Sequence, residues 1–315
     1  MRYEKLIELI EEFTELEWFE DEDHSGVQVH CSREEIDRVL VCLELNDEVI
    51  AEAVAKQADM IITHHPLLFH PVNSITPDTP VGRYLLQLIA SGIDVYSSHL
   101  AFDAAPRGNS IYLAELLRLR DVAVPEEWDE QVPDDGEESG GFRFGGRMDD
   151  AHCYARRASF FGDHIEVRDV INDEDTEFEY DMDEVGSIGY LPVPMDFREF
   201  CTYVERRLDL PKNYIRCVDG GRDKLEKIAF CTGAGGEFIY RAVREHCDAY
   251  ITGDLKLHEA QYAKAMGLTV IDAGHYGTEK IFTENFAAQL REAVEEEGGQ
   301  LAVMEAESVT NPYTL

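Results

Sequence analysis

Histidine and carboxylate side chains follow four apolar runs of this sequence, at the point where each run ends. The runs are MIIT, VYSS, AYIT and VIDAG, and the polar residues that come after them are His64, His65, His99, Asp103, Asp254, His258, His275 and Glu279. Five of the 11 histidines of the chain belong to this set, so they are concentrated at these positions. Imidazole and carboxylate ligands suit Zn, Mn, Fe, Co or Ni better than Ca or Mg. The pattern therefore predicts a divalent-metal site.

The spacing within two of these pairs supports the same chemistry. His99 and Asp103 are four residues apart, and so are His275 and Glu279, which places both groups of each pair on one face of a helical turn. One such pair is common on exposed helices, but its recurrence after corresponding strands is a stronger signal. His99 could equally be a hydrogen-bonded core histidine, and Asp254 could be an ordinary turn residue.

Adjacent His64 and His65 would face opposite sides of a continuing strand. Pro66 turns the chain directly after them, so that both rings can face one crevice, and we favour metal ligation over a structural role. A Gly-rich loop at 232–236 also follows a strand and precedes a helix. It reads equally as an anion cradle at a helix N-terminus and as a tight turn, and it lacks the lysine of a P-loop.

The strands that carry these residues belong to a repeated unit. Residues 36–65 and 225–254 align without a gap, and eight of the thirty positions are identical, including Cys42/Cys231 and Asp59/Asp248. Average residue usage gives about two identities by chance. Each copy reads as strand, helix, strand, and continues through a further helix and strand. The sequence thus predicts an internal duplication.

These elements define an α/β fold of two similar halves, with mixed sheets covered by helices. We expect a first α/β half at 1–121, a small acidic β-rich insertion at 122–184 and a second α/β half at 185–315, with a metal site formed jointly by both halves. Carboxyl ends of strands are where ligands gather in open α/β sheets. Further helices are expected at 3–19, 108–119, 197–208 and 278–297.

Composition limits the classes of function. The formal net charge of the 315-residue chain is −37, with 20 Arg and only 8 Lys, which disfavours nucleic-acid binding through a basic surface. Such acidity fits the acidic proteome of a high-salt cytoplasm, and also an ordinary acidic protein. No apolar run is long enough for a membrane helix, and the acidic N-terminus does not resemble a secretory signal, so we expect a cytoplasmic protein. The seven cysteines show no C-x-x-C spacing and read as small buried hydrophobes in a reducing compartment.

Several motifs resemble the dinuclear-metal-centre family known as GTP cyclohydrolase 1 type 2 homologues. They cover most of the chain apart from the acidic insertion, in order: ITHHPLLF (62–69), YSSHLAFDAAPRGN (96–109), GSIGYLPVPM (186–195), CTGAGG (231–236), YITGDLKLHEA (250–260) and IDAGHYGTEK (271–280). The resemblance implies two divalent metal ions per subunit and a toroidal homohexamer. The ligands that it implies are His64, His65, Asp103, His275 and Glu279.

The resemblance also places His99 and His258 near the metals, as contacts to substrate or to the ligands, and as candidate catalytic groups for moving a proton. Three stretches depart from the family pattern: DHSGVQ at 23–28, Arg107-Gly108-Asn109, and Glu44 on the first strand, where relatives commonly have Asp. None of these departures removes an implied ligand. They concern the shape of the pocket and its contacts to substrate.

Two classes of function follow. The first is a metal-dependent hydrolase with a small-molecule substrate, GTP or another nucleotide, whose imidazole ring would be opened by a metal-bridging hydroxide; phosphoester hydrolysis is equally open to two metals. Either Glu279 or Asp103 could bridge the ions. The second is a non-enzymatic metal-binding, scaffold or metal-delivery protein, since a fold and site resemblance does not establish an activity.

Overall fold

The computed structural model describes residues 1–14, 23–123 and 186–313. The ranges 1–124 and 184–315 form one compact unit, which contains both copies of the repeated sequence. The predicted β-rich insertion falls almost entirely on residues outside the described ranges, as does the end of the helix predicted at 3–19. Among the described residues, no helix is both long enough and apolar enough to cross a membrane.

The first sheet has five strands, all parallel except for one edge strand. Its order is β1 (Gly26–Val29), β4 (Asp94–Ser97), β3 (Met60–Thr63), β2 (Arg38–Cys42) and β11 (Ala302–Glu305), with β1 antiparallel to β4. Every residue of β3 and β4 is buried, as expected for strands covered on both faces. The C-terminal strand β11 thus completes the sheet of the first half.

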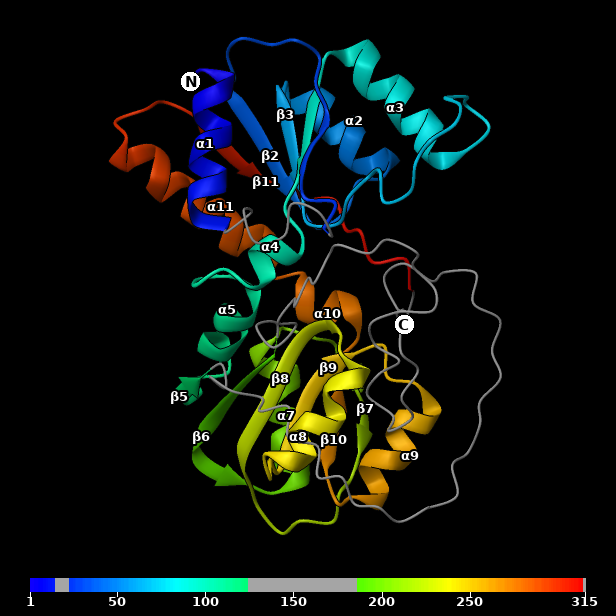
Figure 1. The fold of residues 1–315 in the computed structure, drawn as a ribbon, viewed down its shortest axis with the longest axis vertical. Helices are drawn as coiled ribbons and strands as arrows, with labels where there is room; N and C mark the ends of the chain where they lie inside the picture. Colours follow the sequence, from blue (N-terminus) through cyan, green and yellow to red (C-terminus); the bar gives the residue numbers. More distant parts are fainter. Residues whose placement is uncertain (15–22, 124–185, 314–315) are drawn as a thin grey trace, which may run out of the picture. The chain divides into compact units, whose positions relative to one another are not determined.

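Alternate residues of these strands belong to two separate apolar clusters. Val39 and Val41 pack with residues of α1 (Tyr3–Thr14) and α11 (Phe282–Glu296), whereas Leu40 and Cys42 pack with those of α2 (Asp47–Lys56) and α3 (Pro80–Ser91). The packing therefore follows the two-residue period of a strand, in which successive side chains point to opposite faces of the sheet. Figure 1 shows the two pairs of helices flanking the sheet.

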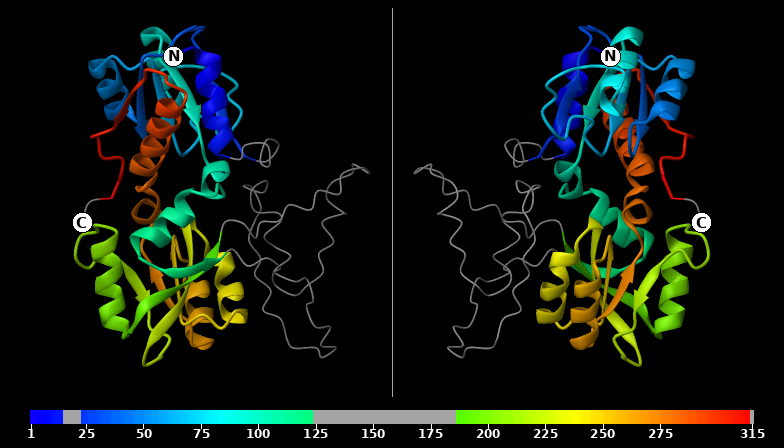
Figure 2. Two further views of the ribbon diagram at one scale, coloured as in Figure 1. Left: turned by 90° about the vertical axis from the view of Figure 1, so that its left-hand side faces the viewer. Right: turned by 90° about the vertical axis from the view of Figure 1, so that its right-hand side faces the viewer.

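The second sheet has six strands and a parallel centre. Its order is β5 (Arg120–Ala123), β6 (Ser187–Met195), β8 (Leu225–Ala234), β9 (Ala249–Gly253), β10 (Thr269–Asp272) and β7 (Arg216–Val218). Strands β8, β9 and β10 are parallel, and the others pair antiparallel. Helices α5 (Asn109–Leu116) and α7 (Phe197–Arg207) pack into one apolar cluster with the sheet, while α8 (Ile239–Arg244) and α9 (Leu257–Ala265) contact β9 and β10 (Figure 2).

The predicted duplication is visible as β2-α2-β3-α3-β4 in the first half and β8-α8-β9-α9-β10 in the second. In both, the three strands are parallel neighbours in the same order. The predicted fold class, an α/β protein with two helix-covered mixed sheets, is therefore confirmed.

Local signals set the ends of several helices. The Asn46 side chain accepts a hydrogen bond from Val49 N (2.8 Å) at the start of α2, and Asp196 and Glu199 form a capping box at the start of α7. The helix predicted at 278–297 is wrong at its start, because α11 begins at Phe282. Glu279 ends a separate short helix, α10 (His275–Glu279), which directly follows β10.

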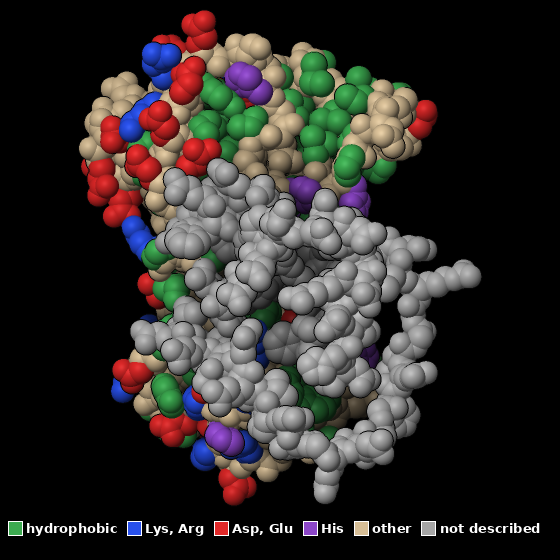
Figure 3. Space-filling model, in the orientation of Figure 1, with side chains coloured by type: hydrophobic (Ala, Val, Ile, Leu, Met, Phe, Trp, Pro, Cys, Tyr) green, Lys and Arg blue, Asp and Glu red, His purple; other side chains and the backbone are tan. Residues whose placement is uncertain are grey.

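The cysteine prediction is right in part. Cys42, Cys231 and Cys247 are buried and reduced, as expected for small apolar side chains. The prediction is wrong for Cys217, which is exposed, and for Cys31 and Cys201, which are half-buried, while Cys153 lies outside the described residues. Figure 3 shows acidic side chains gathered mainly along the left side of the visible described surface.

Candidate metal centre

The histidines and carboxylates predicted from strand ends converge at the carboxyl ends of β3, β4 and β10. Ligand atoms lie within 4.8 Å of one another in three overlapping groups: His64, His65 and His99; His65, His275 and Glu279; and His64, Asp103 and Glu279. Asp103 ends the short helix α4 (Leu100–Asp103), and Glu279 ends α10, so each carboxylate comes from a single helical turn after a strand. All five ligands implied by the resemblance are in these groups.

Two of the residues predicted after strand ends, Asp254 and His258, lie outside these groups. His258 is in the first turn of α9 with 56% of its side chain exposed, and its Nε2 is 4.0 Å from Glu259 Oε1. Its role near substrate therefore stays a prediction.

Glu279 is the centre of the cluster. Its Oε2 lies 3.0 Å from His65 Nε2 and 2.9 Å from His275 Nε2, and its Oε1 lies 3.8 Å from His64 Nε2. The carboxylate is 4% exposed, so it has little access to water. The two oxygens of one buried carboxylate thus face two different sets of imidazole nitrogens.

His64 is held with one ring nitrogen available to a cation. Its ring is fully buried, and its Nδ1 lies 2.8 Å from the Ser98 carbonyl oxygen, to which it donates. In the neutral ring, the proton on Nδ1 leaves Nε2 with a lone pair, 3.5 Å from Asp103 Oδ2 and without a hydrogen-bond partner among the described residues. An unpartnered buried nitrogen beside two carboxylates is the donor set that a divalent metal ion satisfies.

His65 and His275 approach each other through their Nε2 atoms, which are 3.3 Å apart. Each has a carboxylate on its other ring nitrogen: Asp254 Oδ2 lies 2.9 Å from His275 Nδ1, and Glu44 Oε1 lies 3.4 Å from His65 Nδ1. Carboxylates behind ligating histidines fix the ring orientation and raise the basicity of the metal-facing nitrogen. Both histidines are thereby oriented toward Glu279.

His99 also has a carboxylate partner. Its Nδ1 lies 2.8 Å from Asp23 Oδ1, and Asp23 is buried and accepts a further hydrogen bond from Ala101 N at 3.2 Å. The His99 ring centroid is 5.2 Å from that of His64 and 5.6 Å from that of His65. His99 therefore lies at the edge of the cluster, paired with a buried carboxylate, and its role near the metals stays a prediction.

Two of these partners, Glu44 and Asp23, were not predicted as site residues. Glu44 was noted only as a departure from the family pattern, and Asp23 only as part of another departing stretch. Asp254 was among the residues predicted after strand ends, with an ordinary turn as the alternative. Position was the available signal for Glu44 too, since it follows β2 as Asp254 follows β9. Asp23 has no such signal, because it reaches His99 from a segment before β1.

Electrostatics in the metal-free protein are dominated by this cluster. Burial lowers the pKa of His65, but pairing with Glu279 and Glu44 outweighs it and raises the pKa to about 9. Burial likewise opposes the charge on His275, and Asp254 with Glu279 raises its pKa to about 10. The three histidines around Glu279 hold the pKa of its carboxyl well below the usual value against the effect of burial. Protons therefore occupy this site when no metal does, and a metal ion must displace them.

The Gly-rich loop at the end of β8 packs against the same carboxylate. Gly233 has a φ of +63°, and a Cβ at this position would overlap Glu279 Oε1 and lie 3.3 Å from His275 Nε2. The Gly233 amide donates to Thr278 Oγ1 at 2.9 Å. Glycine is thus required here by close approach to the cluster as well as by backbone conformation.

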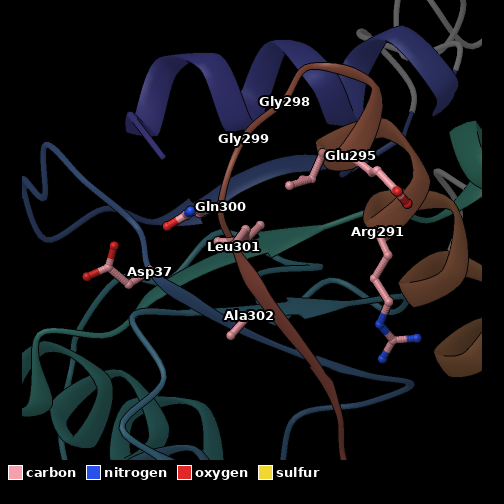
Figure 4. Close-up of a pocket in the computed structure, with 9 residues that line it drawn as sticks. Asp37, Arg291, Glu295, Gly298, Gly299, Gln300, Leu301 and Ala302 are labelled. Carbon is pink, nitrogen blue, oxygen red and sulfur yellow. The ribbon is translucent and has the colours of Figure 1, made fainter.

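A groove of about 790 Å³ lies elsewhere on the same unit (Figure 4). It is lined by Asp37, which precedes β2, by Ala302 at the start of β11, and by residues around the end of α11. The amino ends of β2 and β11 are opposite the strand ends that carry the histidines. The groove contains none of the residues of the cluster, so we place the chemistry at the carboxyl ends.

The fold and the site together define an α/β protein of two duplicated halves that share a candidate divalent-metal centre. The chain belongs to the Duf34/NIF3 (NGG1p interacting factor 3) family, whose sequence model matches residues 1–312. The family resemblance inferred from the motifs is confirmed.

Similar proteins span almost the whole chain. A GTP cyclohydrolase 1 type 2 homolog from Bacillus subtilis is 29% identical over 369 aligned positions, covering 99% of this chain and 98% of that protein. One from Streptococcus pneumoniae is 27% identical, with 98% and 97% covered. Among solved structures, a Bacillus cereus protein related to NIF3 has a TM-score of 0.77 at 22% identity, with 100% and 99% covered, which shows the shared fold.

Proposed function

We propose that this protein binds two divalent metal ions per subunit and is a metal-dependent hydrolase acting on a nucleotide-like small molecule. The observation that carries the proposal is the buried Glu279 carboxylate, with one oxygen toward His65 and His275 and the other toward His64. Two donor groups that share one carboxylate are the arrangement expected for a pair of ions. Zn, Mn, Fe, Co or Ni suits this set of imidazole and carboxylate donors.

Glu279, rather than Asp103, is the residue that we assign to both ions. Asp103 Oδ1 accepts a hydrogen bond from Asn109 Nδ2 at 2.8 Å and lies 3.4 Å from Thr232 Oγ1. Only Asp103 Oδ2 then remains, near His64. One ion would have His65, His275 and Glu279 as ligands, and the other would have His64, Asp103 and Glu279.

Five protein ligands for two ions leave coordination positions for water and substrate, which favours chemistry over a closed structural site. When bound, such ions act as Lewis acids and lower the pKa of coordinated water toward neutrality. His99, held at Nδ1 by buried Asp23, is placed to hold or move a proton beside His64 and His65. His258 is proposed to contact substrate.

The substrate class rests on the relatives. Several are named GTP cyclohydrolase 1 type 2 homolog, so we propose hydrolytic ring opening of GTP or a related nucleotide as the first reaction to test. The family resemblance further supports a homohexamer, and the cytoplasmic location stays the proposal made from the sequence. Multi-angle light scattering of the purified chain checks the assembly, and a monomer at micromolar concentration would contradict it.

The experiment is elemental analysis of metal per chain for the wild type, His65→Ala and Glu279→Ala, with His70→Ala as the control. His70 is near His65 in the chain but exposed and outside the cluster. We expect about two ions in the wild type and in His70→Ala, and fewer in the other two variants. A wild type that neither retains nor takes up metal would overturn the site.

Activity is tested on metal-loaded protein, with GTP first and simple phosphoesters beside it. Hydrolysis that exceeds the His65→Ala background supports the enzyme. Two bound ions without such hydrolysis would instead favour a metal-binding, scaffold or delivery protein, because the ligands would then be occupied without an attached reaction.

A further inference from the structure

Two thiols of the second half lie in contact. Cys201 is on α7, Cys217 is on β7, and their Sγ atoms are 3.4 Å apart. Both are reduced in the structure. The sequence separates them by sixteen positions with no recognisable motif, so the pair emerges only from the fold.

Both sulfurs are within reach of a dissolved reagent. Cys217 is exposed on an edge strand that pairs with β10 alone, where it lies opposite Ile271. Cys201 packs partly against the apolar cluster under α7 and is half-buried. Cys42, Cys231 and Cys247 are fully buried and are therefore shielded from the same reagent.

The geometry is close to that of a disulfide. A disulfide has an S–S length of about 2.05 Å, so the sulfurs must approach by about 1.4 Å from their 3.4 Å separation. Rotation of the two side chains, together with the freedom of the three-residue edge strand β7, can supply a movement of this size. The contact with the Cys217 thiol lowers the pKa of Cys201, and we assign Cys201 as the sulfur that attacks first.

Charged neighbours select the class of reagent. Glu205 and Asp219 lie close enough to act on the Cys201 thiol, and Glu205 and Asp272 act on the Cys217 thiol. Asp272 is already paired with Arg216, so the negative charge near the two thiols comes from Glu205 and Asp219, and an anionic disulfide is repelled while a cationic one is attracted.

We propose that Cys201 and Cys217 form a redox-active dithiol that a positively charged low-molecular-weight disulfide oxidises to an internal disulfide. The Cys201 thiolate attacks one sulfur of the reagent, breaks its S–S bond and releases one thiol, leaving a mixed disulfide on Cys201. Cys217 then attacks the Cys201 sulfur and releases the second thiol. Two electrons pass from the cysteine pair to the reagent, and the two cysteine protons end on the two released thiols. This site is independent of the proposed metal chemistry.

The test uses the folded full-length chain and cystamine, a disulfide with two positive charges. A Cys153→Ser background is used because Cys153 lies outside the described residues. That background has six thiols, and we expect cystamine to reduce the count to four, with peptide mapping showing one Cys201–Cys217 cross-link that dithiothreitol reverses. Six remaining thiols, or a cross-link between other cysteines, would overturn the proposal.

Matched variants separate the pair from general thiol reactivity. Cys217→Ser should stop at a stable cysteamine adduct on Cys201, with no cross-link. Cys31→Ser is the control, because Cys31 is half-buried with its Sγ directed to the Ile93 carbonyl oxygen, and it should still lose two thiols. If Cys217→Ser does not fold, as judged by circular dichroism, the peptide map of the Cys153→Ser protein decides alone. A cross-link that survives in Cys217→Ser would contradict the assignment.

Discussion

The two copies of the repeated unit agree at the amino ends of their strands and differ at the carboxyl ends. In the first copy, Asp59 Oδ2 accepts from Asp37 N at 2.9 Å and Arg38 N at 3.0 Å. In the second copy, Asp248 Oδ2 accepts from Glu226 N and Lys227 N, both at 2.9 Å. The repeated aspartate therefore fastens the start of the first strand in the same way in both halves.

An arginine completes the same contact in each copy. Arg33 pairs with Asp59 at 2.8 Å and donates to the Gly92 carbonyl oxygen, and Arg222 pairs with Asp248 at 2.6 Å and donates to that of Gly267. These two arginines have the same offset as the aligned repeats, although they precede the stretch in which the repeat was recognised. The amino ends of the strands thus keep the same aspartate–arginine contacts in both copies.

The carboxyl ends have diverged. Where the first copy has His64 and His65 after β3, the second has Gly253, the last residue of β9, followed by Asp254. A Cβ on Gly253 would lie 2.5 Å from the backbone nitrogen of His275, so glycine is needed here to leave room for the backbone that carries His275. One half supplies two adjacent histidines, and the other supplies a glycine and an orienting carboxylate. Stability contacts were retained while the ligand positions were specialised.

A substitution at the carboxyl ends of the strands, where the two copies differ, should have the largest effect. Gly233→Ala places a methyl group against Glu279 Oε1, so the carboxylate must move and metal binding should be lost, seen as near-zero metal per chain by elemental analysis. Gly298→Ala is the matched control, since Gly298 has a φ of +65° with nothing within 4 Å of its Cβ. It should keep its metal and lose only about 1 kcal/mol of stability. Equal metal content in the two variants would refute the clash.

Substitutions at the amino ends of the strands, where the two copies agree, should destabilise both halves to a similar extent. Asp59→Ala and Asp248→Ala each remove two hydrogen bonds to a carboxylate and an arginine partner, and we expect each to lower the free energy of unfolding by about 3 kcal/mol in urea titrations of metal-free protein. Asp254→Ala removes an exposed carboxylate and should lower it by less than about 1 kcal/mol. A much larger loss for one of the two repeated aspartates would show that their roles differ.

The same contrast explains what the sequence could predict. Strand ends, helix periodicity and the duplication are local or repeated patterns, and they placed His64, His65, Asp103, His275 and Glu279 among eight candidate residues. The family resemblance then implied these five as the ligands. The two four-residue spacings, however, are not equivalent in register. Ser98 N donates to the Thr63 carbonyl and Ala273 N to that of Thr252, so His99 corresponds to Gly274 and His275 lies one residue further on.

The partners that hold the ligands could not be read in this way. Asp23 reaches His99 across 76 positions, and the Cys201–Cys217 contact depends on how α7 lies on the sheet. Such contacts depend on tertiary packing and leave no periodic trace in the sequence. The helix boundary at Phe282 was not predicted for a related reason. The helical pattern of the sequence continues across the turn after Glu279, so it does not show where one helix ends and the next begins.

The orienting carboxylate of the second copy should have an intermediate effect. Asp254→Asn weakens the partner of His275 Nδ1 and should reduce metal affinity by roughly 10–100-fold in competition with a chromogenic chelator. Asp223→Asn, on an exposed residue outside the cluster, should leave the affinity unchanged. An unchanged affinity in Asp254→Asn would mean that His275 is oriented by packing alone.

The smallest effect is expected where only the first copy carries a carboxylate. Glu52 on α2 accepts hydrogen bonds from Glu307 N and Ser308 N, both at 2.9 Å, whereas the aligned position of the second copy is Arg241. Burial raises the pKa of Glu52, but the hydrogen bonds from Lys56, Ser308 and Glu307 outweigh it and bring the pKa to about 2. Glu52 therefore holds the C-terminal segment in its charged form.

The pH dependence of Glu52→Gln follows from this shift. Because the folded-state pKa lies below the ordinary value of 4.5, the charged carboxylate adds stability above pH 4.5 and loses that contribution as the pH falls toward about 2. We expect Glu52→Gln to lower the free energy of unfolding by about 1 kcal/mol at pH 7. The value is small because the lost hydrogen bonds are replaced by hydrogen bonds to water. Urea titrations of metal-free protein at pH 7, 5, 4 and 3.5 should show this difference constant above pH 5 and shrinking below it. A difference that grows on acidification would mean that the carboxylate does not hold the C-terminal segment in its charged form.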